Sequence, residues 1–175
     1  MAISMDQTLA QTAEQQRSRY FGKYRGLVQD VNDPESMGRI TAKVPAVYGD
    51  EESPWAMPAS PFAGSQHGFL ALPEQNDGVW MEFEAGDPSR PIWSGFWWGS
   101  NEMPSPNGPL QRVWVTSQGL KIVLDDDSKK LQLLHPGGGE ITMTDNDITI
   151  KIGSAQIVLS SSGVSINNGA IEVST

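Results

Sequence analysis

The sequence predicts an all-β protein in which a small closed barrel precedes a stack of short strands that intertwines three chains. Between residues 20 and 100, short runs of alternating apolar and polar residues are separated by turn-prone residues, which is typical of a small β-barrel. From residue 141 to 175, an apolar–polar–apolar fragment recurs every seven residues, with Ser, Asn and Gly between the fragments. A coiled coil has the same period but needs helix formers between its apolar positions, so the tail is predicted to form strands.

The seven-residue repeat defines two rows of mostly branched apolar residues. They are Ile150, Ile157, Val164 and Ile171 in the first row, and Ile152, Leu159, Ile166 and Val173 in the second. Strands this short, with one apolar face, are not stable alone, and such repeats bury that face by stacking on copies. We therefore expect an obligate homotrimer with an intertwined triple-stranded β-helix; the alternative is a one-chain β-solenoid or a sandwich edge. The predicted trimer core comprises Ile141, Met143, Ile148, Ile150, Ile152, Ile157, Leu159, Val164, Ile166, Ile171 and Val173.

The composition excludes several classes of protein. The 175 residues carry a net charge of −9, which disfavours binding to nucleic acid or to a phosphate-rich membrane surface. The chain has no cysteine, so disulfides and thiolate metal sites are excluded. No stretch has the length of a membrane span, and the N-terminus lacks a signal-peptide pattern.

Residues 1–19 are predicted to form a polar, Gln-rich extension. Ile3, Met5, Leu9 and Ala13 have roughly helical spacing, and Asp6 or Thr8 would start such a helix. Two interpretations stay open, a frayed extension and an arm that docks on a partner protein.

Residues 20–100 are predicted to form the barrel. Strands are expected at 24–31, 39–44, 69–72, 78–84 and 90–98, with a long Pro- and Gly-rich connection at 46–68. Five short strands with one long connection are typical of the oligonucleotide/oligosaccharide-binding (OB) barrel. A Pro/Gly linker at 101–111 follows, and the needle is predicted at 112–175, with strands at 113–116, 121–124, 130–134 and 140–144 before the seven-residue rows.

The barrel residues resemble a known family. The most specific stretch is the Phe-Glu-x-Gly-Asp-Pro-x-Arg-Pro run at 83–91. It resembles the OB domain of the central spikes of contractile injection machines: phage baseplate spikes, the valine–glycine repeat protein of type VI secretion, and spikes of extracellular phage-tail-like particles. The motif positions, predicted to be structural, are Gly26, Gly38, Phe83, Gly86, Asp87, Pro88, Arg90 and Pro91. We expect Gly86–Pro88 to form a tight turn, and Arg90 to pair with Glu82, Glu84 or Asp87.

The residues predict no catalytic or metal site and no cofactor. The carboxylates of Glu82, Glu84 and residues 125–127 lie on an alternating strand or in a turn, without the desolvation that a paired acid and base require. The run at 125–128 lacks the glycine and distal glutamate of a calcium loop, and His67 and His135 stand alone. Two other functions stay open: a single-strand nucleic-acid binder, although acidic residues outnumber basic ones in residues 1–100, and a glycan-cleaving tail spike.

The resemblance implies a structural, non-enzymatic spike that pierces a target envelope when the sheath contracts. It also implies a trimeric hub at the end of the tail tube as a partner, and a tip-capping protein with a proline–alanine–alanine–arginine (PAAR) repeat. Such a spike is assembled in the bacterial cytoplasm and becomes part of a virion or injection particle.

Overall fold

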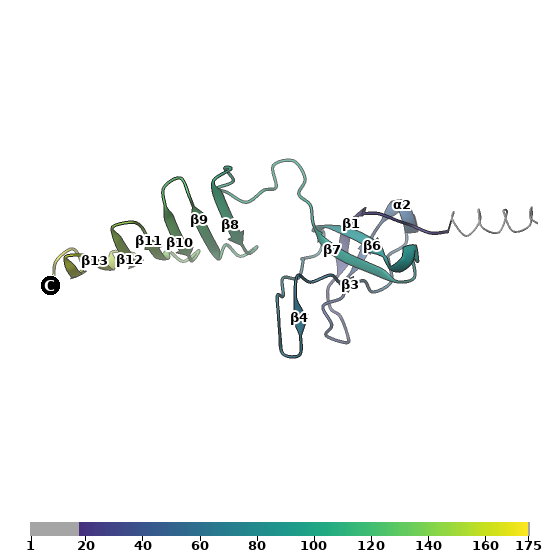
Figure 1. Cartoon of the computed structure of the whole chain (residues 1–175), viewed down its shortest axis with the longest axis horizontal. Coiled ribbons are helices and arrows are strands. Elements are labelled where there is room, and N and C mark those ends of the chain that lie inside the picture. Colours follow the sequence, from purple (N-terminus) through teal and green to yellow (C-terminus); the bar gives the residue numbers. More distant parts are fainter. Residues whose placement is uncertain (1–17, 175) are drawn as a thin grey trace, which may run out of the picture. The chain divides into compact units, whose positions relative to one another are not determined.

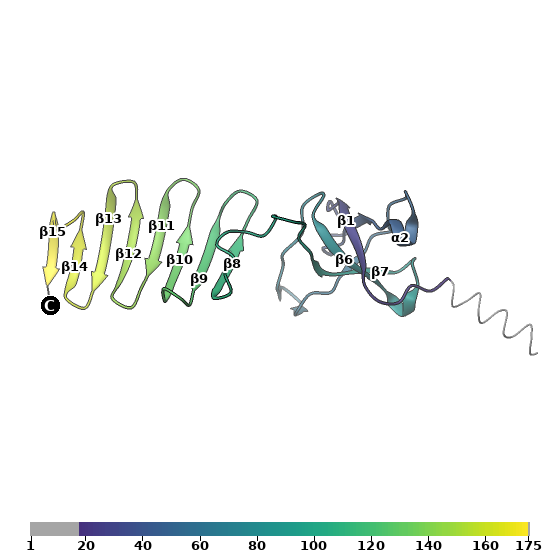
Figure 2. The same cartoon turned by 90° about the horizontal axis from the view of Figure 1, so that it is seen from above.

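A computed structural model describes residues 18–174 of the chain. They form two compact units that divide between Gly99 and Ser100. The first is a small barrel and the second is a single sheet, coloured green to yellow (Figures 1 and 2). The predicted helix in residues 1–17 lies outside the described residues.

The barrel is a five-stranded sheet closed by two bridges. Its strands, in the order β2-β1-β6-β7-β3, are Thr41–Lys43, Tyr24–Asp30, Gly78–Phe83, Pro91–Phe96 and Met57–Pro58. The bridges Ile40–Ala56 and Lys43–Glu52 connect the two edge strands and close the sheet. The all-β fold with an N-terminal OB-type barrel is as the sequence predicts.

Alternating residues of the barrel strands fill its interior. In β6, Val79, Met81 and Phe83 are buried, while the residues between them are half-buried. The remaining buried apolar residues of this core are Val28, Ile40, Ala42, Val44, Ala56 and Trp93. Gly26 faces this core too, because a Cβ there would lie 3.0 Å from the Met81 side chain.

The fifth barrel strand differs from the predicted one. Residues 69–72 form no strand; instead β3 pairs in parallel with β7, through Met57–Ile92 and Pro58–Trp93. The apolar residues 69, 70 and 72 suggested a strand, but they are exposed and form no strand. The connection before it holds a short helix α2 (Pro45–Tyr48) and a hairpin of β4 (Ala63–Gly64) and β5 (His67–Gly68).

The second unit is an eight-stranded antiparallel sheet in which every strand pairs with its neighbours in sequence (Figure 2). The strands β8 to β15 are Gln111–Val115, Lys121–Asp125, Lys130–Leu134, Gly139–Met143, Asp147–Ile152, Ala155–Ser160, Gly163–Ile166 and Ile171–Ser174. The seven-residue period thus reflects one short strand plus one tight turn.

A carboxylate network holds the loop between β1 and β2. Asp33, whose side chain is 4% exposed, accepts hydrogen bonds from the backbone N–H groups of Glu35, Met37 and Arg39. The Arg39 guanidinium also donates to Asp33 through Nε (3.0 Å) and Nη2 (2.6 Å), and it lies 5.7 Å from the Trp55 ring centre. The hydrogen bonds from Arg39, more than any other cause, hold the pKa of Asp33 well below its ordinary value.

The lowered pKa of Asp33 predicts a pH-dependent contribution to stability. Because the folded-state pKa lies below the unfolded one, the contribution is complete above about pH 4 and is lost as the pH falls through the folded pKa. Asp33→Asn should therefore lower the melting temperature clearly at pH 7 and less at pH 3. Thermal denaturation of both proteins at the two pH values measures this. Glu35→Gln, which alters the more exposed partner of Arg39, is the control and should have little effect. A constant gap between wild type and Asp33→Asn would contradict the assignment.

Candidate assembly surface

The strand register of the second unit places its apolar side chains on one face. Residues directly opposite each other in a sheet point to the same face. Ile141 is opposite Leu133 and Ile150, and Ile150 is in turn opposite Ile157. The same relation continues from strand to strand, so the apolar residues form continuous rows across the sheet.

Two such rows cross all eight strands. The first is Trp114, Ile122, Leu133, Ile141, Ile150, Ile157, Ile166 and Ile171, and the second is Arg112, Leu124, Leu131, Met143, Ile148, Leu159, Val164 and Val173. Ile152, opposite Gly139 and Ala155, lies on this face too. We call these residues, without Arg112 at the β8 end of the second row, the apolar face. All eleven predicted core residues belong to it.

The observed strand pairing places two residues in the opposite rows from those that the seven-residue period predicts. Because alternate strands run in opposite directions, Val164 lies in the row of Leu159, whereas Ile166 lies in the row of Ile157. The five apolar residues at 114–133 were missing from the predicted core. In β10, Leu131 and Leu133 alternate with Lys130 and Gln132, which was the signal for that strand; β8 and β9 contain the continuous apolar runs 113–115 and 122–124, which do not show a single apolar face.

The apolar face is exposed in the single chain. Ile152 is 65% exposed, Ile171 59% and Val173 64%. A shallow groove of about 700 Å³ runs along the face between Leu120 and Ile166. A contiguous exposed apolar surface of this kind marks an interaction site.

The opposite face of the sheet is mainly polar from β11 to β15, whereas at the β8–β9 end it carries Val113 opposite Val123, which is 3% exposed. In the polar part, Glu140 is opposite Lys151, Thr142 is opposite Thr149, and Lys151 is opposite Gln156. One apolar and one polar face are expected of an antiparallel sheet that packs on a core from one side only. The sheet therefore has one surface suited to solvent and one suited to packing against protein.

The motif at 83–91 forms a compact turn that holds residues 19–21. Gly86 has φ +76°, and a Cβ there would lie 3.0 Å from the Phe21 ring. Tyr20 N donates to Gly86 O (2.8 Å), and Arg19 Nη1 donates to Ala85 O (3.1 Å). This turn therefore requires glycine both for its backbone conformation and for the approach of Phe21.

Side chains around the same turn form further polar contacts. Asp87 Oδ1 accepts from the backbone N–H and the hydroxyl of Ser89, and these bonds lower its pKa. Arg90 forms an ion pair with Glu84, one of the three carboxylates considered for it. Tyr48 donates to Pro88 O (2.6 Å); burial and, next, the charge of Asp87 raise the pKa of Tyr48 to about 12.

Gly86→Ala is expected to destabilise the barrel more than Gly22→Ala does. Both glycines have positive φ, +76° and +93°, so each alanine incurs about 1–2 kcal/mol of backbone strain. Only at Gly86 would the new methyl also displace the Phe21 ring, because nothing lies within 4 Å at Gly22. Chemical denaturation of both variants measures the difference. Equal losses of stability would show that Phe21 does not depend on the turn.

The aromatic residues that a nucleic-acid binder would use are engaged within the barrel. The Arg25 guanidinium lies 5.6 Å from the Trp80 ring centre and 5.1 Å from that of Trp97. Trp97 Nε1 donates to Val79 O, and Trp93 is buried with its Nε1 donating to Gly38 O. Stacking of bases on Trp80 or Trp97 would compete with Arg25 for the rings.

Two family models match the two units. Residues 24–98 match the type VI secretion system/phage-baseplate injector OB domain. Residues 111–172 match the phage baseplate V C-terminal trimerisation domain. The chain belongs to the family of baseplate spike proteins of phages and type VI secretion systems. None of the curated proteins compared with the chain matches it.

The trimerisation match covers the unit that carries the apolar face. It spans all eight strands, from Gln111 in β8 into β15, and it supports a homotrimer. A baseplate component is part of a virion or injection particle. No helix in residues 18–174 is long and apolar enough to cross a membrane. Within the same residues, no group of three or more His, Asp or Glu side chains could hold a metal ion.

Proposed function

We propose that the protein is the non-enzymatic central spike of a contractile injection particle. Three copies turn the apolar faces of their sheets toward a common axis and form the triple-stranded β-helical needle. Three barrels form a collar that seats on a trimeric hub at the end of the tail tube. When the sheath contracts, the needle pierces the target envelope.

The observation that carries the proposal is the unbroken apolar face. Three sheets around one axis bury this face in three chains at once, and the polar faces remain in water. The apolar area thereby removed from water stabilises the assembly by about 25 cal/mol per Å². Three sheets close a cross-section narrow enough for branched aliphatic side chains to fill.

The proposed mechanism is mechanical and needs no bond chemistry. A needle that transmits force must resist local unfolding. Strands that are hydrogen-bonded to a neighbour on both sides and share one core unfold only together with those neighbours. Two of the carboxylates considered for catalysis take part in ion pairs, Glu82 with Lys23 (2.8 Å) and Glu84 with Arg90. We further propose assembly in the bacterial cytoplasm, a docking role for residues 1–19, and a PAAR-repeat cap at the distal end.

Electron microscopy of the particle that contains this chain tests the proposal. A gold label on a C-terminal affinity tag should lie at the distal end of the baseplate, beyond the tail tube. Particles that carry Ile157→Asp should lack this density and should release less dye from target cells. Label along the sheath, or wild-type dye release by particles without the spike, would overturn the proposed function.

A further inference from the structure

The segment 59–73 of the barrel unit is uncharged and rich in exposed apolar side chains. In a chain of net charge −9, these 15 residues contain no Asp, Glu, Lys or Arg. Leu70 is 74% exposed, Phe62 58%, Phe69 46% and Leu72 43%. Depletion of charge together with aromatic enrichment is the composition of the core of a protein–protein interface.

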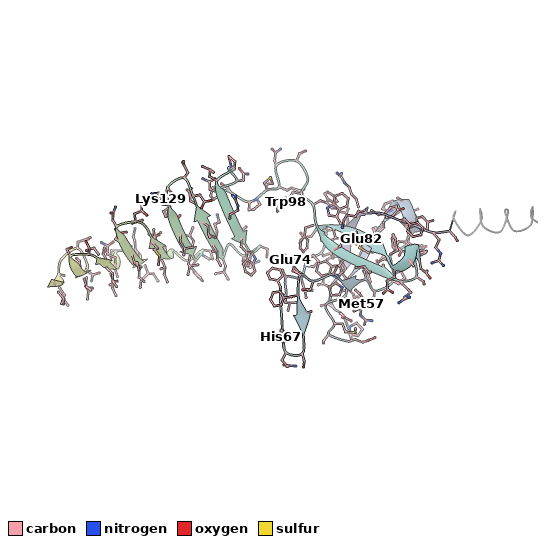
Figure 3. All side chains as sticks on the ribbon, viewed as in Figure 1. Met57, His67, Glu74, Glu82, Trp98 and Lys129 are labelled. Carbon is pink, nitrogen blue, oxygen red and sulfur yellow. The ribbon has the colours of Figure 1, made fainter. Side chains whose placement is uncertain are left out.

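The middle of this segment stands away from the barrel. Figure 1 shows the β4–β5 hairpin projecting from the barrel body, and Figure 3 places His67 toward its far end. Only two strand pairs, Ala63–Gly68 and Gly64–His67, hold the hairpin together, and Ser60 Oγ bonds the carbonyls of Phe62 and Phe69 at its neck. A two-stranded hairpin is marginally stable in water and needs a surface to pack against.

We infer that segment 59–73 is an arm that packs on the barrel of the neighbouring protomer in the trimer. This inference rests on the proposed function, because it requires the trimer. The strand stack begins at Gln111, and only residues 97–110 separate it from the end of β7. Fourteen residues span at most about 50 Å. This linker keeps each of the three barrels close to the trimeric strand stack, so the barrels meet each other at high effective concentration.

The position of the arm on the barrel favours a protomer over a hub as its partner. The arm leaves the barrel at the middle of β7, where Ala59 N donates to Trp93 O (2.9 Å), and it starts in the direction of β7 because β3 and β7 are parallel. From the end of β7 the chain continues toward the trimerisation domain. The opposite end of β7, next to the Gly86 turn, is the end that holds residues 19–21. The arm and the proposed docking extension thus lie at different ends of the β6–β7 pair.

The barrel also presents an apolar surface that can receive the arm. Leu27, opposite Gly78, and Phe96, at the irregular end of β7 opposite Val79, lie at the same end of β6; both side chains are more than 40% exposed. Trp98, 58% exposed, follows Trp97, whose backbone N–H donates to Gly78 O. An arm and a receiving patch at different places on one surface form a heterologous contact, which closes into a ring under three-fold symmetry.

Site-directed photo-crosslinking tests the arm, since the natural chain has no cysteine. Ser65→Cys at the exposed turn of the hairpin is labelled with a benzophenone maleimide and irradiated as the full-length protein. Glu51→Cys, in the exposed turn after α2, is the matched control on the same barrel. The mass of each unirradiated sample is measured by light scattering.

With Ser65→Cys, irradiation should shift the denatured chain from 19.0 kDa to two and three times that mass. Mass spectrometry should find the crosslink on residues 18–99 of the neighbour, and Glu51→Cys should stay at the mass of one chain. A trimer in which Ser65→Cys crosslinks no better than Glu51→Cys, or crosslinks to residues 111–174, would overturn the arm and leave the spike intact. A monomeric sample would overturn both proposals.

Discussion

Ile157→Asp is expected to reduce the trimer to single chains. Ile157 lies in the middle of the apolar face, opposite Ile150 and Ile166. In the proposed trimer, three carboxylates would meet in one buried layer without a cation to pair with. Each uncompensated buried charge costs about 3–5 kcal/mol, and the repulsion among the three adds to it. Light scattering of the purified variant should give the mass of one chain.

Val158→Asp is the matched control for this prediction. It makes the same kind of change one residue further along β13, where Val158 is opposite Thr149 and Ser165 on the polar face. This variant should remain trimeric. If both variants dissociate, loss of the strand itself explains the result; if neither does, the apolar face is not the trimer interface.

Trp93→Ala is expected to destabilise the barrel while the chain remains trimeric. Trp93 is 8% exposed, packs in the barrel core and donates to Gly38 O (3.1 Å). Truncation of a buried tryptophan typically costs about 3–5 kcal/mol. Because the barrel and the strand stack are separate compact units, calorimetry should show that only one of two transitions moves to lower temperature.

Trp93→Phe separates packing from the hydrogen bond. The phenyl ring retains much of the apolar contact but leaves the Gly38 carbonyl without its indole donor, so a loss of about 1–2 kcal/mol is expected. A loss as large as that of Trp93→Ala would place the main contribution in the hydrogen bond and contradict the packing account. A change in the mass of either variant would show that the barrel core also controls assembly.

The regular parts of the fold could be predicted because local pattern and tertiary structure agree in them. In β6, the alternation of Val79, Met81 and Phe83 with half-buried residues corresponds to the inside and outside of the barrel. In the tail, β-branched residues at short spacing correspond to strands with one apolar face. The Phe83–Pro91 run was recognisable because its turn requires glycine, aspartate and proline at adjacent positions.

The parts that could not be predicted depend on contacts between distant residues. The apolar residues at 69–72 have the composition of a strand, but pairing of β3 with β7 closes the barrel and leaves them exposed. The network around Asp33 needs the loop to bring Arg39 back onto a carboxylate six residues earlier. Val164 and Ile166 exchange rows because neighbouring strands are antiparallel. The seven-residue period of the sequence does not reveal the direction of the strands.

The solution mass of the full-length protein, measured by light scattering at several concentrations, tests the central claim most directly. The account predicts three times the 19.0 kDa chain mass at every concentration at which the protein is folded. A folded monomer that keeps its strand stack, with the apolar face in water, would contradict it.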